Sequence, residues 1–317
     1  MNDWFESRTF QHSQFEDVEA LRRAKDAQGL TVSVCIPTLN EAGTVGAIVE
    51  TIRRSLVERA GLVDELVVLD SASTDGTVQA AEQAGARVVQ DGDLVPDLPH
   101  LGGKGDAMWK SLFAVRGDII LWVDADVTDF HPRFVYGLLG PLLEDPSIGF
   151  VKGFYERPLG GGDDPLGGGR VTELVARPLL NAFWPELGAV IQPLSGEYGG
   201  RRHILEAVPF FTGYAVEIGL LIDVATRFGL DTIAQVDLHR RTHRNRSIRE
   251  LSRMAYAILQ GVMTRLRSSG MLDPSTPPPG PFRVFEKTDD RYVMDLVEVL
   301  VRERPPAASV AGYSATR

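Results

Sequence analysis

Apolar residues follow two different periods along the first half of the chain. Short continuous runs rich in Val, Ile and Leu predict β-strands at 32–36, 64–69, 87–90 and 118–123. Helical spacing and typical capping residues predict helices at 13–28, 40–60, 77–84 and 106–115, and one that starts at Pro132. Because strands alternate with helices, we expect a mainly parallel sheet that is covered on both faces.

The second half of the chain has a less regular pattern. A glycine-rich stretch at 160–169 predicts a loop. Helical spacing predicts helices at 172–180, 217–228 and 247–266, and a short apolar run predicts a strand at 232–238. After a proline-rich linker at 275–281, we expect a last helix at 289–301 and a disordered tail at 302–317.

Length, composition and charge narrow the class of protein. The 317 residues, of which 44% are hydrophobic and 24% charged, suit one large domain or two modest ones. A formal net charge of -10 argues against nucleic acid and anionic membranes as partners, because both attract a positive surface. The one cysteine, Cys35, lies in an apolar run and is expected to be an inert core thiol. Because the sequence has no apolar signal segment and no run long enough to span a bilayer, we expect a cytoplasmic protein.

Two carboxylates follow the most apolar of the predicted strands. Asp124, Ala125 and Asp126 come directly after the run Ile-Ile-Leu-Trp-Val at 119–123. Ligands of parallel sheets bind at the carboxyl ends of strands, where two carboxylates can hold a divalent cation that neutralises a diphosphate. A lone Asp-x-Asp motif also occurs as two solvated acids in a loop, so this interpretation depends on its place after a buried strand.

Further candidate binding residues follow the other predicted strands. Pro37 fixes the chain direction, and Glu41 can accept hydrogen bonds from a ribose or a base, although a first-turn helix acid is the alternative. Ser71 lies in a turn after the second strand. Lys104 in Gly-Gly-Lys-Gly offers a positive charge to a phosphate, but the motif lacks the spacing of a P-loop.

Basic residues and one acid are the candidates of the second half. Arg170 precedes a predicted helix start at Thr172, an arrangement that can bind an anion, although an exposed loop arginine is the ordinary alternative. The basic run 240–246 in an acidic chain favours a diphosphate clamp over a solvated face. Glu217 opens a helix, where an acid also stabilises the helix dipole without any ligand.

These motifs together resemble those of GT-A glycosyltransferases. The likeness is carried by Ile-Pro-Thr-Leu-Asn-Glu at 36–41, Asp-Ser-Ala-Ser-Thr-Asp-Gly-Thr at 70–77, Gly-Lys-Gly at 103–105 and Asp-Ala-Asp at 124–126. The stretches at 167–178, 192–198, 213–223 and 242–246 are similar to the family of glucosyl-3-phosphoglycerate synthases, which includes mannosyl-3-phosphoglycerate synthases. The sequence departs from the family at Ala125, where Ser is expected, and at Ala72, where Gly is common and where the change could alter how the base is seated.

The resemblance covers residues 32–266 and implies an α/β fold. That fold would combine a Rossmann-like nucleotide-sugar domain of GT-A type with a C-terminal acceptor-binding α/β portion. We expect a helical lead-in at 1–31, a nucleotide-sugar-binding half at 32–150, and an acceptor-binding half at 151–274 that completes the metal site. A linker, a helix and a flexible tail would make up 275–317.

The resemblance also implies roles for individual residues. Asp126 and His243 would bind Mg²⁺, with Mn²⁺ able to take its place, and Asp124, Asp126 and Glu217 would be catalytic. The donor-binding residues would be Pro37, Glu41, Ser71, Lys104, Asp124, Ala125, Asp126, Glu217 and Arg241. The acceptor-binding residues would be Gly169, Arg170, Thr172 and Asn245.

The implied reaction is a retaining transfer of glucose, with UDP-glucose the favoured donor, to the 2-hydroxyl of 3-phosphoglycerate by a homodimer. Mannosyl transfer from GDP-mannose is the alternative within the family. Outside the family, a sugar-phosphate nucleotidyltransferase and a non-catalytic nucleotide-sugar sensor remain open. Retention can proceed by front-side attack or, with a carboxylate such as Glu217 as nucleophile, by two displacements.

Overall fold

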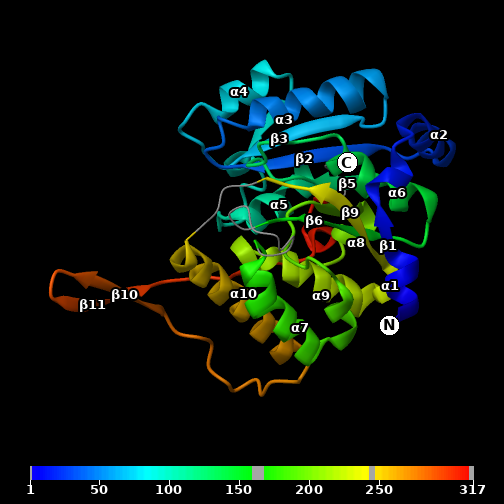
Figure 1. Cartoon of the computed structure of the whole chain (residues 1–317). Helices are drawn as coiled ribbons and strands as arrows, with labels where there is room; N and C mark the ends of the chain where they lie inside the picture. Colours follow the sequence, from blue (N-terminus) through cyan, green and yellow to red (C-terminus); the bar gives the residue numbers. More distant parts are fainter. Residues whose placement is uncertain (1, 159–167, 243–246, 314–317) are drawn as a thin grey trace.

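A mixed eight-stranded sheet forms the central layer of the molecule (Figure 1). The computed structural model describes residues 2–158, 168–242 and 247–313. In spatial order, the strands are β1 (Thr9–Gln11), β9 (Ile233–Arg240), β6 (Phe150–Glu156), β7 (Tyr198–Arg201), β5 (Ile119–Trp122), β2 (Val32–Thr38), β3 (Glu65–Asp70) and β4 (Arg87–Gln90). Neighbouring strands are parallel, apart from β7, which runs antiparallel to both β5 and β6. The predicted α/β fold with a mainly parallel sheet is therefore confirmed.

Helices cover both faces of the sheet, as expected. One layer contains α2 (Val18–Gln28), α3 (Val45–Ile52), α4 (Thr77–Gln83) and α6 (Arg133–Glu144). The other layer contains α1 (Asn2–Arg8), α5 (Lys104–Ala114), α7 (Arg177–Phe183), α8 (Arg202–Leu205), α9 (Val216–Phe228) and α10 (Ile248–Ser268). A hydrophobic core lies between the sheet and each helical layer. In β5, Ile119 and Leu121 pack in the core of the first layer, whereas Ile120 and Trp122 pack in the core of the second. A strand that is buried on both faces needs apolar residues at every position, which explains the continuous run.

Short 3₁₀ and π-helical turns join these elements. They are η1 (His12–Phe15), η2 (Arg53–Arg59), η3 (Asp91–Asp93), η4 (Thr172–Ala176), η5 (Pro185–Ala189), η6 (Gly213–Ala215), η7 (Leu230–Thr232) and η8 (Ala307–Ser309). The turn η4 leads straight into α7, so the helix predicted at 172–180 is confirmed and runs on to Phe183. Among the described residues, no helix combines the length and the apolar character needed to cross a membrane.

Two predicted helix starts were wrong. The helix predicted from Ser13 begins at Val18, because Asp17 accepts a hydrogen bond from the Ala20 N–H and so caps it. Gly29, with a φ of 64°, does end this helix as predicted. The helix predicted from Asn40 begins at Val45. Asn40 has a φ of 58° and hydrogen-bonds Ser73 and Thr74, so its side chain joins two loops instead of capping a helix.

The C-terminal predictions were also wrong. In place of a helix at 289–301, β10 (Phe282–Thr288) and β11 (Arg291–Val297) form an antiparallel hairpin that projects from the body of the molecule (Figure 1). On β11, Tyr292, Met294 and Leu296 recur with period two and so lie on one face of the hairpin. In place of a disordered tail, β12 (Glu303–Arg304) pairs with β8 (Phe210–Phe211). Arg304 and Tyr313 are buried, so the described part of this segment is packed into the fold.

Candidate active site

A cavity of about 470 Å³ lies at the carboxyl ends of β2, β3 and β5. The sheet-edge wall of this cavity includes Pro37, Glu41, Ser71, Lys104, Asp124, Ala125, Asp126 and Arg241. The helical wall consists of Gly168, Gly169, Arg170, Val171, Thr172, Gly213, Tyr214, Glu217, Leu251, Met254 and Ile258. The cavity thus brings together the described candidate residues of both predicted sites. His243 and Asn245, predicted to bind metal and acceptor, lie outside the described residues.

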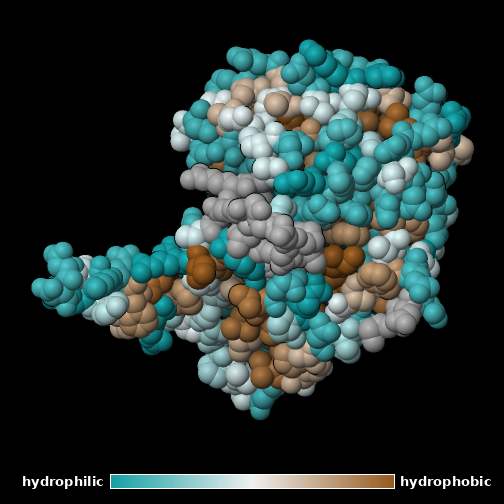
Figure 2. Space-filling view, in the orientation of Figure 1, coloured by the Kyte–Doolittle hydropathy of each residue, from teal (hydrophilic) through white to brown (hydrophobic). Residues whose placement is uncertain are grey.

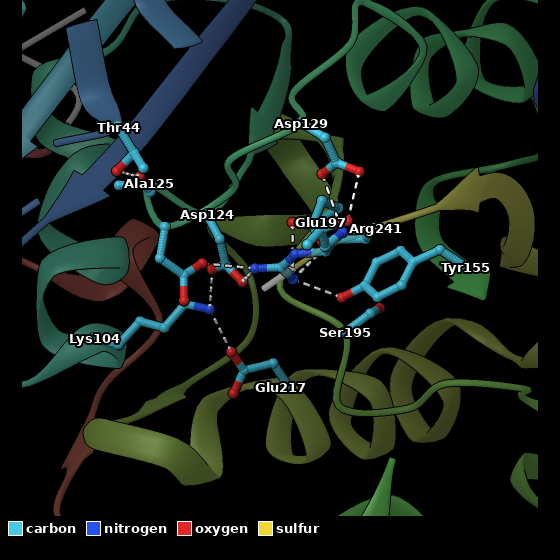
Figure 3. Close-up of polar contacts among 12 residues, drawn as sticks. Thr44, Lys104, Asp124, Ala125, Asp129, Tyr155, Ser195, Glu197, Glu217 and Arg241 are labelled. Carbon is cyan, nitrogen blue, oxygen red and sulfur yellow. Dashed lines mark hydrogen bonds and ion pairs between the residues drawn. The ribbon is translucent and has the colours of Figure 1, made fainter. Parts of the chain in front are cut away.

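Lys104 links the two walls. Its Nζ lies 2.7 Å from Oδ1 of Asp124 on the sheet-edge wall and 2.9 Å from Oε1 of Glu217 on the helical wall (Figure 3). Gly103, at a φ of 84°, turns the chain into α5 so that Lys104 is its first residue. A Cβ at Gly103 would lie 3.1 Å from the backbone nitrogen of Gly213, so the two walls touch there.

Arg241, just beyond the end of β9, holds four side chains together (Figure 3). Its Nη2 lies 3.0 Å from Oδ2 of Asp124 and 2.7 Å from Oδ1 of Asp126. Its Nη1 donates to the hydroxyl of Tyr155 at 2.6 Å and lies 3.1 Å from Glu197. The Arg241 side chain is only 4% exposed, so these contacts replace its solvation.

The charges of these groups fix one another. Burial alone would raise the pKa of Asp124, but Lys104 and Arg241 outweigh burial and hold that pKa well below its usual range. Burial likewise opposes the charge of Lys104, yet Asp124 and Glu217 raise its pKa well above the ordinary value. The two cations and Asp124 are therefore charged at neutral pH, and the site presents preorganised donors to an anionic ligand.

Three buried polar residues near the site were not predicted individually. Glu197, which directly precedes a strand that the sequence pattern did not reveal, is completely buried, and this burial raises its pKa although Arg241 opposes the shift. Tyr155 and Lys152 lie on β6, also unpredicted. Lys152 donates to the carbonyl of Ser195 at 2.7 Å, and burial lowers its pKa to about 7. The stretch 192–198, which contributed to the resemblance, was the one signal for Glu197.

Glycine makes room for the Asp124 carboxylate. A Cβ at Gly196 would lie 2.0 Å from Oδ2 of Asp124, so any other residue would displace that carboxylate. A Cβ added at Gly199, on β7, would likewise lie 2.2 Å from the carbonyl oxygen of Ile120 on β5. The glycines of β7 thus allow it to pair closely with β5 near Asp124, and this pairing places Glu197 beneath the site.

The predicted nucleotide-side residues are held by local hydrogen bonds. The Glu41 N–H donates to Oγ1 of Thr77 at 2.8 Å, and the Ser71 hydroxyl donates to Oδ2 of Asp91 at 2.9 Å. Both residues line the cavity next to Pro37. The loops after β2 and β3 are therefore joined to α4 and η3, which fixes this side of the cavity.

The predicted metal site is described in part. Asp126, whose side chain is 34% exposed, offers carboxylate oxygens at the cavity wall. Within the ranges that the structure describes, no group of three or more His, Cys, Asp or Glu side chains is arranged to hold a metal ion. Asp129 accepts hydrogen bonds at 3.0 Å from both the N–H and the hydroxyl of Thr242. This contact fixes the residue that precedes His243.

Comparison with known protein families and known proteins indicates the same family as the sequence motifs. The family model for glycosyl transferase family 2 matches residues 33–197. The glucosyl-3-phosphoglycerate synthase of Petrotoga mobilis is 47% identical over 99% of this chain and 97% of its own length. That of Mycolicibacterium smegmatis is 49% identical over 89% of this chain and 90% of its own length.

Solved structures also match over nearly the whole chain. A crystal structure of mannosyl-3-phosphoglycerate synthase from Rubrobacter xylanophilus has a TM-score of 0.90 at 42% identity and covers 98% of this chain and 99% of its own. Glucosyl-3-phosphoglycerate synthase from Mycobacterium tuberculosis, in complex with Mn²⁺, UDP and phosphoglyceric acid, has a TM-score of 0.83 at 43% identity. It covers 95% of this chain and 98% of its own. The chain therefore belongs to the family 2 glycosyltransferases and, among them, to the family of the glucosyl-3-phosphoglycerate synthases.

Proposed function

We propose that this enzyme transfers glucose from UDP-glucose to the 2-hydroxyl of 3-phosphoglycerate with retention at the anomeric carbon. The observation that carries the proposal is the single cavity that joins Asp124, Asp126, Lys104 and Arg241 to the segment with Arg170. One wall suits a nucleotide diphosphate, and the other suits a phosphorylated acceptor. The Mycobacterium tuberculosis relative supports it, because it was crystallised with Mn²⁺, UDP-glucose and phosphoglyceric acid.

The donor is held through charge in this proposal. Asp126 and His243 would hold Mg²⁺ or Mn²⁺, and carboxylate oxygens of the Asp126 kind suit both ions. When bound, that cation neutralises charge on the diphosphate and improves it as a leaving group. Arg241 and Lys104 add positive charge beside the diphosphate, while Pro37, Glu41 and Ser71 contact the nucleoside. Asp124 and Glu217 accept hydrogen bonds from the sugar.

The acceptor is held on the helical wall. Arg170 pairs with the phosphate of 3-phosphoglycerate, assisted by Gly169, Thr172 and Asn245. Both substrates then lie in one cavity, so the acceptor hydroxyl can attack the anomeric carbon on the face from which the diphosphate departs. A leaving phosphate oxygen accepts the hydroxyl proton. Arg241 and Lys104 stabilise the charge that develops on the diphosphate.

A second donor is favoured by one observation. The Rubrobacter xylanophilus structure, with a TM-score of 0.90, is a mannosyl-3-phosphoglycerate synthase. The alternative function is therefore mannosyl transfer from GDP-mannose by the same cavity.

A donor panel decides between these functions. The enzyme is incubated with 3-phosphoglycerate, Mg²⁺ and either UDP-glucose, GDP-glucose or GDP-mannose, and the product is identified by mass and by its anomeric NMR coupling. We expect α-glucosyl-3-phosphoglycerate as the main product. A mannosyl product would favour the alternative, a β-linked product would reject retention, and binding without turnover of any donor would indicate a sensor. Pyrophosphate release from a nucleoside triphosphate would indicate a nucleotidyltransferase.

The projecting hairpin supports a homodimer. One face of β10 and β11 carries Phe285, Tyr292, Met294 and Leu296, each more than half exposed, beside Arg283 and Lys287. A lone two-stranded hairpin is marginal in water, so this apolar face needs a partner. A second copy of this chain, with its net charge of -10, suits the basic flanks. Figure 2 shows further apolar surface on the same half of the molecule, around α7 and α10.

Light scattering after gel filtration tests the dimer. The variant Phe285→Ser/Met294→Ser should run as a monomer, whereas Val293→Ser, on the other face of the hairpin, should keep the mass of the wild type. A monomeric wild type would reject the proposal. The predicted cytoplasmic location, and the absence of nucleic-acid and membrane partners, remain predictions.

A further inference from the structure

A buried ion pair connects the C-terminal segment to the nucleotide side of the cavity. Asp106, on α5, is completely buried, and Arg304, on β12, is 3% exposed. Arg304 Nε donates to Oδ1 of Asp106 at 2.6 Å, and Nη2 donates to the carbonyl of Pro99 at 2.6 Å. The guanidinium also lies over the ring of Trp109, at 4.9 Å from its centroid. These contacts lie outside the cavity lining, so the catalytic roles above do not account for them.

The second oxygen of Asp106 holds the loop that carries Lys104. Oδ2 accepts hydrogen bonds from the backbone N–H groups of Leu101 at 3.2 Å and Gly102 at 2.9 Å. Gly103 and Lys104 follow directly. The Asp106 carboxylate therefore links the glycine-rich loop to Arg304. The direction of that loop determines the position of Lys104, which follows it.

The same carboxylate is linked to Ser71. Lys110 Nζ lies 3.7 Å from Oδ2 of Asp106 and donates to the carbonyl of Asp91 at 2.8 Å. Asp91 in turn accepts the hydrogen bond of the Ser71 hydroxyl. All three charged side chains of this link are buried. One polar network thus reaches two of the predicted donor-binding residues.

The C-terminal segment also supports the helical wall. Residues Glu303 and Arg304 pair with Phe211 and Phe210 of β8. The Thr212 N–H donates to the carbonyl of Arg302 at 2.8 Å, and the Arg302 N–H donates to Oγ1 of Thr212 at 3.0 Å. Gly213 and Tyr214, which line the cavity, come next in the chain. Residues 302–304 therefore hold both the glycine-rich loop and the segment that touches it.

We propose that the C-terminal segment 302–304 fixes the donor site and that Arg304 is a positioning residue for Lys104 and Ser71. Without its arginine, the buried Asp106 carboxylate is left with the longer 3.7 Å contact with Lys110, and it is no longer a fixed acceptor for the two backbone N–H groups. The loop then moves relative to Asp124, and the donor binds less well. This inference rests on the proposed function, because that function makes Lys104 and Ser71 donor-binding residues.

Arg304→Lys tests the proposal with the least change in charge, since a lysine keeps the cation but loses the two-pronged contact with Asp106 and Pro99. We expect UDP binding in the presence of Mn²⁺, measured by calorimetry, to weaken about tenfold or more. The KM for the donor should rise in step, while the KM for 3-phosphoglycerate stays unchanged. Tyr313→Phe is the matched control, because Tyr313 anchors the same segment through Arg202, away from the glycine-rich loop. It should leave both KM values unchanged.

Two further measurements separate positioning from general destabilisation. Asp106→Asn/Arg304→Gln replaces the ion pair by a neutral pair that can still accept the loop N–H groups, and it should bind UDP more tightly than Arg304→Lys. Hydrogen exchange of the amides of 101 and 102 should accelerate in Arg304→Lys and not in Tyr313→Phe. Unchanged UDP binding and exchange in Arg304→Lys, or an equal rise of both KM values, would overturn the proposal. If the wild type itself fails to bind UDP, the proposed donor is rejected, and hydrogen exchange still decides the role of Arg304.

Discussion

The sheet-edge wall and the helical wall of the cavity differ in how they hold their charged groups. On the sheet-edge wall, Lys104 and Arg241 lie within 3.1 Å of carboxylates that come from three separate parts of the chain, the segment after β5, Glu197 and α9. On the helical wall, Arg170 stands in a glycine-containing segment beside the apolar side chains of α10. Because the charged groups of the sheet-edge wall are buried and pair with one another, a substitution there should lower stability as well as activity. On the helical wall, a substitution of Arg170 should change the affinity for one substrate.

The largest effect is expected for Arg241→Ala. This change leaves Asp124 and Glu197 without their shared cation, so the free energy of unfolding should fall by about 3–5 kcal/mol. Turnover should fall below detection, because the diphosphate loses its main positive partner. Urea unfolding and a UDP-release assay measure the two effects. Arg240→Ala, at the exposed neighbouring position, should change neither. If the two variants had equal effects, the paired charges around Arg241 would matter no more than an exposed surface residue, and the contrast would be wrong.

Asp126→Asn should remove metal-dependent turnover with a smaller loss of stability. Asp126 is the most exposed of the three carboxylates that Arg241 contacts, so its neutralisation leaves less charge unpaired in the interior. Initial rates should fall on the order of 100-fold or more, because a neutral amide is a poorer ligand for Mg²⁺ and Mn²⁺. Rates are measured across a titration of each ion. A variant that keeps the rate and metal dependence of the wild type would show that Asp126 is not a metal ligand.

Arg170→Ala should affect the acceptor alone. Loss of a cation beside a phosphate raises the KM for 3-phosphoglycerate by roughly tenfold or more. The KM for the donor and the unfolding free energy should stay close to those of the wild type. Arg177→Ala is the control, because Arg177 lies on the following helix and pairs with Glu173 instead of lining the cavity. A higher KM for the donor with an unchanged KM for the acceptor would place Arg170 in the donor site instead.

A pH dependence of stability is expected from Lys152. Burial lowers the pKa of Lys152 to about 7, below the value of an exposed lysine. Between these two values the unfolded chain binds more protons than the folded chain, so the contribution of Lys152 to stability increases as the pH rises through that window. Relative to Lys152→Met, the wild type should gain roughly 2 kcal/mol in unfolding free energy between pH 7 and pH 9. Chemical denaturation at the two pH values checks this. A difference that does not change with pH would show that Lys152 is charged throughout.

The sequence predicted most of the sheet-edge wall, because local pattern determines it. The apolar runs that became β2, β3, β4 and β5 identify their own strands, and the residues after a parallel strand necessarily meet at one edge of the sheet. The sequence thus places Asp124 and Asp126 at the ligand-binding edge of the sheet. Predictions failed where a local signal competed with a contact to another loop. Asn40 looks like a helix cap, but its bonds to Ser73 and Thr74 hold it in a left-handed conformation.

The remaining parts depend on residues that are distant in sequence. Arg304 lies 198 positions from Asp106, and nothing in the local pattern around either residue indicates the pair. Glu197 lies next to a strand of Tyr-Gly-Gly-Arg, which has no apolar alternation and is formed because β5 and β6 accept it from both sides. Tertiary pairing of this kind overrides local propensity. The buried partners of the residues that line the cavity were therefore the hardest part to predict.

A structure with Mn²⁺ and UDP-glucose bound tests the central claim most directly. The claim is that the acids after β5 form the cation and diphosphate site of an activated sugar. We predict that the ion is bound by Asp126 and His243, with the diphosphate against Arg241 and the glucose between Asp124 and Glu217. An ion held by other residues, or a diphosphate that makes no contact with Arg241, would contradict the account.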